Sequence, residues 1–156
     1  MTACSDTNAW LEVFGYLHPM VLHFPVTLLL FDIDDFKKYN DQFGHGVGDT
    51  VLRVMAQRVA GVVRAQDTFG RFGGEEFALL LPCTPLDDAM RVAEKIRCTI
   101  ADTPVEVQGT SVPVTASVGV AAARVGAPAY DVLISEADAA LYSAKRQGRN
   151  RSVAFV

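Results

Sequence analysis

The chain has 156 residues, of which 50% are hydrophobic and 21% are charged, and its formal net charge is −4. A chain of this size and composition indicates one globular domain that needs no disulfide or metal to fold. The acidic balance argues against a nucleic-acid-binding domain, since such domains usually carry a basic face. The three cysteines, Cys4, Cys83 and Cys98, show no CxxC spacing, so we expect reduced thiols and no zinc site.

The N-terminal part of the chain indicates a protein that does not enter a membrane. The apolar run at residues 26–31 is too short to span a bilayer, and the N-terminus lacks the basic region of a signal peptide. We therefore expect a cytoplasmic location. Two histidines, His18 and His23, lie five residues apart with a proline between them, which favours local packing over a metal pair.

The first predicted element is a strand at residues 26–33, because its nearly continuous apolar run is typical of a strand covered on both faces. Residues 34–43 form a short charged stretch that we expect to be helical, and glycines at 44–48 end it. A longer helix is predicted from Asp49 to about Arg64, where apolar residues recur at helical spacing and Asp49 serves as N-cap or first-turn acid.

Two further strands, at residues 67–72 and 77–81, flank the turn GGEE. The remaining elements follow in the order helix, strand, helix and edge strand, at residues 86–100, 112–121, 130–147 and 150–156, with Gly148 just after the last helix. This order predicts an α/β (α+β) sandwich, in which helices surround a mostly antiparallel central sheet.

Acidic side chains gather at two of these element ends. Asp32 lies at the end of the first strand, with Asp34 on the same face, and the turn supplies Glu75 and Glu76. If the first strand and the hairpin are neighbours, Asp32 and one glutamate can share Mg²⁺, which relieves their repulsion. Taken alone, the same residues also fit a solvent-exposed acidic turn, a strand end and a helix N-cap.

Four separated segments together closely resemble the GGDEF family of diguanylate cyclases, in order and in spacing. They read FDIDDFKKYNDQFGHGVGDTVL, RAQDTFGRFGGEEF, VTASVGVA and ADAALYSAKRQGRN, and the resemblance covers about residues 27–155. It implies a palm-like nucleotidyl-cyclase fold and the condensation of two GTP molecules into cyclic di-GMP, with release of two pyrophosphates. It also implies a homodimer, because each subunit would hold one GTP.

The resemblance assigns roles to particular residues. Mg²⁺ or Mn²⁺ would be bound by the side chains of Asp32 and Glu75 and by the Ile33 carbonyl. Glu75, Glu76 and Lys37 match the catalytic groups, and Glu76 would help to activate the attacking hydroxyl or bind the metal. The positions that match the substrate-binding residues are Phe36, Asn40, Asp49, Gly73, Gly74, Lys145 and Arg149. Without the resemblance, Lys145 and Arg149 also fit favourable charge at a helix C-terminus.

A second site is implied by the sequence RAQD. Arg64 and Asp67 form an RxxD motif five residues before GGEEF, which matches the family's inhibitory site for the product cyclic di-GMP. A helix-terminal arginine beside a loop aspartate is the alternative reading. A second arginine usually completes such a site, and Arg91 and Arg97 are the candidates.

The chain departs from the family before the first strand. Residues 1–25 contain no DxLTGLxNR segment, and we divide the chain into an atypical N-terminal segment, 1–25, and a GGDEF domain, 26–156. No upstream sensory domain is visible. This departure keeps open a catalytically silent module that binds cyclic di-GMP or GTP. An RNA-binding α/β module is disfavoured by the net acidity and by the lack of a stacking aromatic pair flanked by basic residues.

Overall fold

The computed structural model of the chain describes residues 10, 12–16, 19, 23–126 and 129–156. Its centre is a five-stranded sheet in the order β2-β3-β1-β6-β7. Neighbouring strands run antiparallel except β6 and β7, which are parallel. The predicted fold class, a mostly antiparallel sheet among helices, is confirmed. The five strands are β1 (Val26–Ile33), β2 (Thr68–Gly73), β3 (Glu76–Pro82), β6 (Ala116–Ala122) and β7 (Ser152–Ala154).

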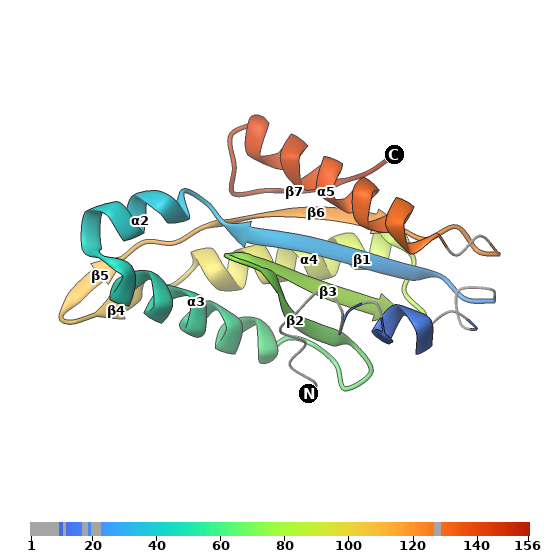
Figure 1. Cartoon of the computed structure of the whole chain (residues 1–156), viewed down its shortest axis with the longest axis horizontal. Coiled ribbons are helices and arrows are strands. Elements are labelled where there is room, and N and C mark those ends of the chain that lie inside the picture. Colours follow the sequence, from blue (N-terminus) through green and yellow to red (C-terminus); the bar gives the residue numbers. More distant parts are fainter. Residues whose placement is uncertain (1–9, 11, 17–18, 20–22, 127–128) are drawn as a thin grey trace.

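The central strand β1 is buried along its whole length, as its apolar run predicted. Leu29 and Phe31 face the layer formed by α3 (His45–Ala60) and α4 (Leu86–Ala101). Leu28 and Leu30 face the opposite layer, which is formed by α5 (Tyr130–Arg146) together with Trp10 and Phe14. Figure 1 shows α5 on one side of the sheet and α3 and α4 on the other. Burial on both faces explains why the middle of β1, residues 28–31, carries no alternating polar residues.

A glycine in β6 sets how closely α5 approaches the sheet. A Cβ at Gly119 would lie 2.2 Å from the Ala137 carbonyl oxygen and 2.3 Å from the Leu141 nitrogen, both backbone atoms that cannot move aside. Only glycine therefore allows this contact. The close packing fixes α5 against the sheet. As a result Lys145, near the end of α5, forms an ion pair with Asp32 at the end of β1.

The start of α3 differs from the prediction. The helix begins at His45, directly after α2 (Phe36–Phe43) and Gly44, so Asp49 lies in its second turn and is neither N-cap nor first-turn acid. The glycines at 46 and 48 were expected to interrupt the chain, but they are helical. Only Gly44, with φ of 88°, breaks the helix. Contact between α2 and α3 offsets the low helix propensity of the two glycines.

The predicted strand at residues 112–121 is in fact divided between two sheets. Thr110–Val112 forms β5, which pairs with a missed strand, β4 (Val105–Val107), in a separate hairpin. The two turn residues, Gln108 and Gly109, have φ of 50° and 79°. Two consecutive positive φ values in a two-residue loop are typical of a tight hairpin turn. At the C-terminus, β7 is shorter than the predicted strand 150–156, and α5 ends as predicted just before Gly148.

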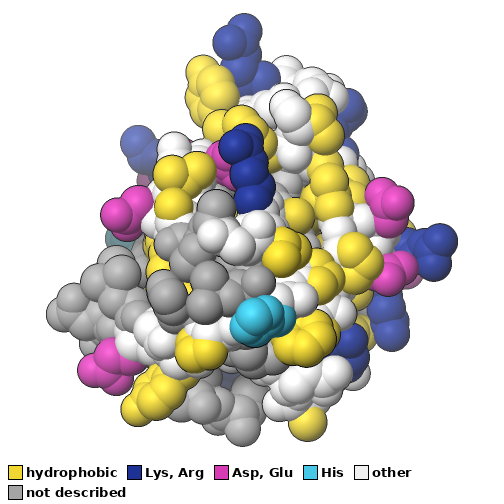
Figure 2. Space-filling model, turned by 90° about the vertical axis from the view of Figure 1, so that its right-hand side faces the viewer, with side chains coloured by type: hydrophobic (Ala, Val, Ile, Leu, Met, Phe, Trp, Pro, Cys, Tyr) yellow, Lys and Arg dark blue, Asp and Glu magenta, His cyan; other side chains and the backbone are white. Residues whose placement is uncertain are grey.

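The end of the molecule where β1 begins is shown in Figure 2. Hydrophobic side chains are spread over this face, and charged side chains of both signs lie among them. Phe24 and Val125 are exposed here. His23 is also exposed, whereas His18 lies outside the described residues, as does Cys4. Cys83 and Cys98 are free thiols. In the part of the chain that the structure describes, no helix has the length and apolar character to cross a membrane.

Candidate active site

The candidate site lies where β1 ends beside the GGEE turn. In the ladder between β1 and β3, Asp32 is paired with Glu76. On the other side of β1, Asp32 is paired with Ser117 of β6. The first strand and the hairpin are therefore neighbours, which is the condition on which the sequence-based metal prediction depended.

A small cavity of about 170 Å³ collects most of the predicted residues. They come from three separate segments: the β1–α2 junction, the GGEE turn and the end of α5. Carboxylates and cations are thereby brought to one opening, beside the N-terminus of α2. The lining residues are Asp32, Ile33, Asp34, Asp35, Phe36, Lys37, Glu75, Lys145 and Arg149.

Asp32 has one oxygen that is paired and one that is not. The Lys145 ammonium donates a hydrogen bond to Oδ2, whereas Oδ1 is buried and has no hydrogen-bond partner among the described residues. Burial raises the pKa of Asp32; Lys145 opposes this shift, and the charges of Asp34 and Glu75 add to it. A buried carboxylate oxygen without a donor is costly unless a cation meets it. Asp32 thus fits a metal ligand.

Glu76 is a second carboxyl with a perturbed proton affinity. Burial raises its pKa, the charges of Asp138 and Asp32 raise it further, and Lys145 opposes them. Among the described residues, no three Asp, Glu, His or Cys side chains are grouped so that they could hold a metal by themselves. A pair of carboxylates completed by backbone and phosphate oxygens is the donor set that suits Mg²⁺. The residues present therefore fit such an ion.

The two glycines of the turn leave its surface open. A Cβ at either Gly73 or Gly74 would meet no heavy atom within 4 Å, and Gly74 has φ of 48°. Arg71 braces the turn, because its Nε donates to the Gly74 carbonyl at 2.6 Å. The turn is thus held in shape while its outer side remains accessible to a ligand.

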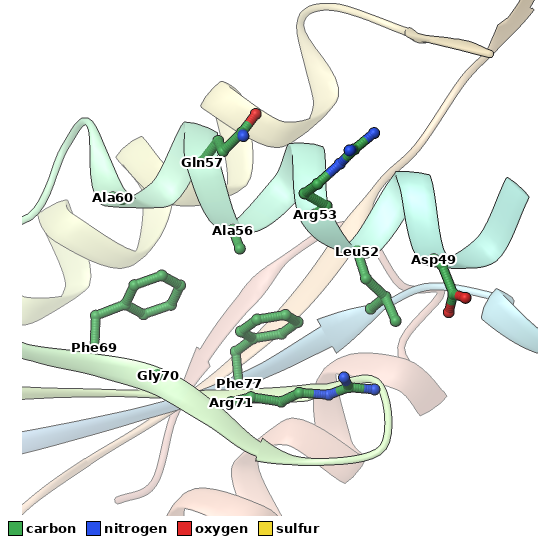
Figure 3. Close-up of a pocket in the computed structure, with 10 residues that line it drawn as sticks. All are labelled: Asp49, Leu52, Arg53, Ala56, Gln57, Ala60, Phe69, Gly70, Arg71 and Phe77. Atoms are coloured by element: carbon green, nitrogen blue, oxygen red, sulfur yellow. The ribbon is translucent and has the colours of Figure 1, made fainter. Parts of the chain in front are cut away.

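A larger cavity of about 490 Å³ lies between α3 and the β2–β3 hairpin. Figure 3 shows Phe69 and Phe77 directed from the hairpin toward Leu52 and Ala56 of α3. Asp49 and Arg71 also line this cavity and supply its charged groups together with Arg53. Asp49 therefore lies apart from the small cavity, in a mainly apolar groove wide enough for a planar ring.

Asn40 of α2 lies against the first turn of α3. Its Oδ1 is buried without a hydrogen-bond partner in the described part of the chain. It packs against Gly48 so closely that a Cβ at position 48 would lie 1.9 Å from Oδ1. Gly48 therefore makes the room that the Asn40 side chain occupies.

The RxxD residues form a separate cluster between α3 and β2. The Arg64 guanidinium donates from Nε and Nη2 to the Asp67 carboxylate, and Nη2 also donates to Thr84 Oγ1 at 2.9 Å. The bond to Asp67 raises the pKa of Arg64. Neither candidate for the second arginine is bonded to this cluster, since Arg91 pairs with Asp88 and Arg97 pairs with Glu94.

Several residues around the small cavity were not predicted as site residues. Asp34 was noted only as a same-face acid or N-cap, and Asp35 was not singled out. Alternation along the strand was the available signal for Asp34. The partners of Asp34 lie more than eighty residues away, so no local pattern could reveal them; they are Thr115, Ser117 and Asn150.

Comparison with known proteins identifies the family of the chain. Residues 17–151 match the family model described as "Diguanylate cyclase, GGDEF domain". The chain therefore belongs to the GGDEF family. It is 47% identical over 131 residues to the response regulator PleD of Caulobacter vibrioides, a match that covers 83% of this chain and 29% of PleD. The diguanylate cyclase DgcP of Pseudomonas aeruginosa is 43% identical over 124 residues, covering 80% of this chain and 18% of DgcP.

Solved structures share the fold along nearly the whole chain. The diguanylate cyclase SiaD of Pseudomonas aeruginosa, solved with its activator SiaC, superposes with a TM-score of 0.90 at 39% identity. This match covers 96% of the present chain and 58% of SiaD. An active GGEEF domain from Vibrio cholerae gives 0.86 at 34% identity and covers 99% of both chains. The chain thus spans one domain's length and less than a third of PleD or DgcP.

Proposed function

We propose that this chain is a diguanylate cyclase domain that condenses two GTP molecules into cyclic di-GMP and releases two pyrophosphates. The observation that carries the proposal is the small cavity, in which four carboxylates and three cations from distant segments meet at a helix N-terminus. The names of the relatives support the same reaction, since DgcP is a diguanylate cyclase. GGDEF diguanylate cyclases generally need a divalent metal.

In this proposal Asp32 and Glu75 hold Mg²⁺, or Mn²⁺, together with the Ile33 carbonyl. The unpaired Oδ1 of Asp32 supports this assignment, because Lys145 occupies only the other oxygen. When bound, the ion supplies charge neutralisation at phosphate oxygens while the 3′-hydroxyl of one GTP attacks the α-phosphate of the other.

The chain's own cations would bind the triphosphate. Lys37, Lys145 and Arg149 line the cavity. The N–H groups of Phe36 and Lys37 at the start of α2 have no partners within the helix, whereas the Lys38 N–H donates to the Asp35 carbonyl. A helix N-terminus and point charges together form a phosphate-binding site. Glu76, whose pKa is raised, is placed opposite Asp32 and is the group that we assign to the proton of the attacking hydroxyl.

Guanine would be bound on the α2–α3 side of the GGEE turn. The Asp49 carboxylate can accept from guanine N1–H and N2–H₂, while the Asn40 amide can donate to a ring acceptor. Gly73 and Gly74 leave the turn open to a nucleotide. Two such half-sites must face each other to join two GTP molecules, so we propose a homodimer as the active state.

The single most direct test is production of cyclic di-GMP by the purified chain with GTP and Mg²⁺, measured at high protein concentration. We expect turnover by the natural sequence and a loss of at least about 100-fold in Glu75→Ala, since one metal ligand is removed. Absence of product at every protein concentration would overturn the proposal. Calorimetry then identifies the alternative: a sensor module would bind cyclic di-GMP but not GTP with Mg²⁺.

The same assay tests whether cyclic di-GMP inhibits the enzyme by binding at Arg64 and Asp67. Arg64→Ala should keep the initial rate and lose inhibition by added cyclic di-GMP, because a guanidinium fork is suited to bind phosphate. Arg124→Ala removes an exposed arginine that belongs to neither predicted site and serves as the matched control. If both variants stay inhibited like the natural chain, RxxD has no regulatory role here.

A further inference from the structure

The loop that follows α5 has an unusual backbone. Gly148, Arg149 and Asn150 all have positive φ, at 115°, 62° and 45°. Glycine adopts this region readily and asparagine tolerates it, but Arg149 is strained there. Such a conformation persists only where neighbouring groups hold it, so the contacts of this loop carry information about its role.

Asp34 is the group that holds the loop. Its side chain is buried, and it accepts hydrogen bonds from the Thr115 and Ser117 hydroxyls at 2.7 and 2.6 Å. It also accepts the backbone N–H of Asn150 at 2.9 Å. Both carboxylate oxygens are thus engaged by donors from β6, the segment before it, and the loop. In this respect Asp34 differs from Asp32, whose Oδ1 has no donor in the described chain.

Two further contacts fix the same loop from its other side. Arg97 of α4 donates from Nη1 to the Asn150 side-chain oxygen at 2.9 Å. The Val118 N–H donates to the Arg151 carbonyl, where β7 joins the sheet. The loop is therefore tied to β6, α4 and the end of β1 at once, and its freedom to move is small.

The consequence concerns Arg149, which lies between these fixed points. Its guanidinium faces the small cavity, 3.4 Å from the Asp35 carboxylate at the start of α2. Asp35 is half-exposed and shares its charge with Lys38, so it does not by itself immobilise Arg149. The backbone of residues 148–150, which is bonded to Asp34 through the Asn150 N–H, fixes the point from which the Arg149 side chain leaves the loop.

We propose that Asp34 is a positioning residue, which holds the α5–β7 loop against the end of β1 and so sets where Arg149 meets the polyphosphate of a bound nucleotide. Asp34 acts through Arg149, because both of its carboxylate oxygens already accept hydrogen bonds from the chain itself. The inference rests on the proposed function only for the identity of the anion. The attachment of the loop itself is a property of the chain alone.

The test combines amide exchange with a double-mutant cycle. Asp34→Asn keeps the size of the side chain but weakens its acceptors. We expect hydrogen exchange at the Asn150 N–H to rise at least 10-fold, and KM for GTP to rise about 10-fold with a smaller change in kcat. Because Asp34 acts through Arg149, Asp34→Asn should add less than about twofold to the KM of Arg149→Ala.

Controls separate positioning from loss of folding. Thr27→Val removes a buried hydroxyl at the opposite end of β1, which donates to the Thr84 carbonyl, and should leave KM unchanged. If Asp34→Asn does not fold, Thr115→Val removes a single donor to Asp34 and should raise exchange at Asn150 and KM in the same direction, by about 2–3-fold.

The outcomes are distinguishable from a failure of the proposed function. If the natural chain binds GTP with Mg²⁺ but makes no product, Kd for GTP replaces KM in the same cycle. If GTP does not bind, inorganic pyrophosphate is the probe, and absence of binding to both overturns the proposal. Unchanged exchange at Asn150 overturns it, as do effects of Asp34→Asn and Arg149→Ala that multiply independently.

Discussion

At the scale of single residues, Asp32 and Asp34 show that two neighbouring aspartates on the same face of a strand can have different roles. The two carboxylates are buried, two residues apart, and line the same cavity. Asp34 has hydrogen-bond donors on both oxygens, whereas Asp32 keeps one buried oxygen without a donor. A carboxylate with satisfied oxygens stabilises structure, and one with an open oxygen is available to a cation.

Glu76 offers a prediction at this scale about pH. Its folded-state pKa is raised above the ordinary glutamate value of 4.5, chiefly by burial, so the folded protein binds this proton more tightly than the unfolded chain does. The sign follows from linkage: this contribution is fully favourable below pH 4.5 and is lost as pH rises through the folded pKa. Without metal, Glu76→Gln should therefore be more stable than the natural chain at pH 8, and this advantage should disappear toward pH 4.

The measurement is urea unfolding of both proteins in chelator at the two pH values. Glu106→Gln is the matched control, because Glu106 is exposed in the separate β4–β5 hairpin and bonds only to Ser111 among the described hydrogen bonds. An equal stability difference at pH 4 and pH 8 would contradict the raised pKa. Cyclase activity of Glu76→Gln should fall in spite of its greater stability, as is common for strained functional sites.

At the scale of elements, the junction of α2 and α3 determines where the predicted guanine-binding residues lie. Asn40 is near the end of α2 and Asp49 is in the second turn of α3. Gly48 lets the two helices approach, because any side chain there would meet Asn40. Gly46 and Gly48, which in the sequence look like part of a break, are therefore helical. At position 48 the packing of α3 against Asn40 leaves no room for a side chain.

The glycines of α3 provide a matched pair of substitutions. Gly48→Ala would place a Cβ 1.9 Å from Asn40 Oδ1 and displace that amide, so KM for GTP should rise about 10-fold or more. Gly46→Ala meets no atom within 4 Å and should stabilise the protein by about 0.4–1 kcal/mol with KM unchanged. Equal KM values for the two variants would show that Asn40 does not bind the base.

At the scale of the whole molecule, the N-terminal segment is part of the core although it lacks the family's usual sequence. Trp10 and Phe14 are each 1% exposed and pack with α5 against one face of the sheet. The Trp10 indole also donates to the Arg71 carbonyl at 3.2 Å. Arg71 braces the GGEE turn, so this segment is linked to the candidate site through the hairpin.

Removal of this packing has a predictable cost. Trp10→Ala should lower the free energy of unfolding by about 3–5 kcal/mol, since a large buried side chain is lost. Tyr16→Ala, which removes an aromatic side chain that is 84% exposed, should change it by less than about 0.5 kcal/mol. Trp10 is the single tryptophan, so circular dichroism, and not tryptophan fluorescence, follows the unfolding of all three proteins. A Trp10→Ala variant as stable as Tyr16→Ala would place the segment outside the core.

Most elements could be predicted from the sequence because their signals are local. The burial of β1, the amphipathic face of α4 and the end of α5 each follow from the spacing of apolar residues. The start of α3 and the hairpin of β4 and β5 were missed. In the first case tertiary contact overrode low propensity. In the second, the predicted strand is divided at residues 113–115, and its first residue, Val112, belongs to β5, which pairs with β4 in a separate sheet.

The sequence by itself determined the fold class, the family and the types of residue that gather at the site. Those features depend on periodicity and on motifs that survive in one dimension. Only the tertiary structure decided which oxygen of Asp32 is open, that Asn40 packs on Gly48, and that Asp34 holds a loop 116 residues away. These facts depend on hydrogen-bond partners from distant segments, which meet only when the sheet has formed.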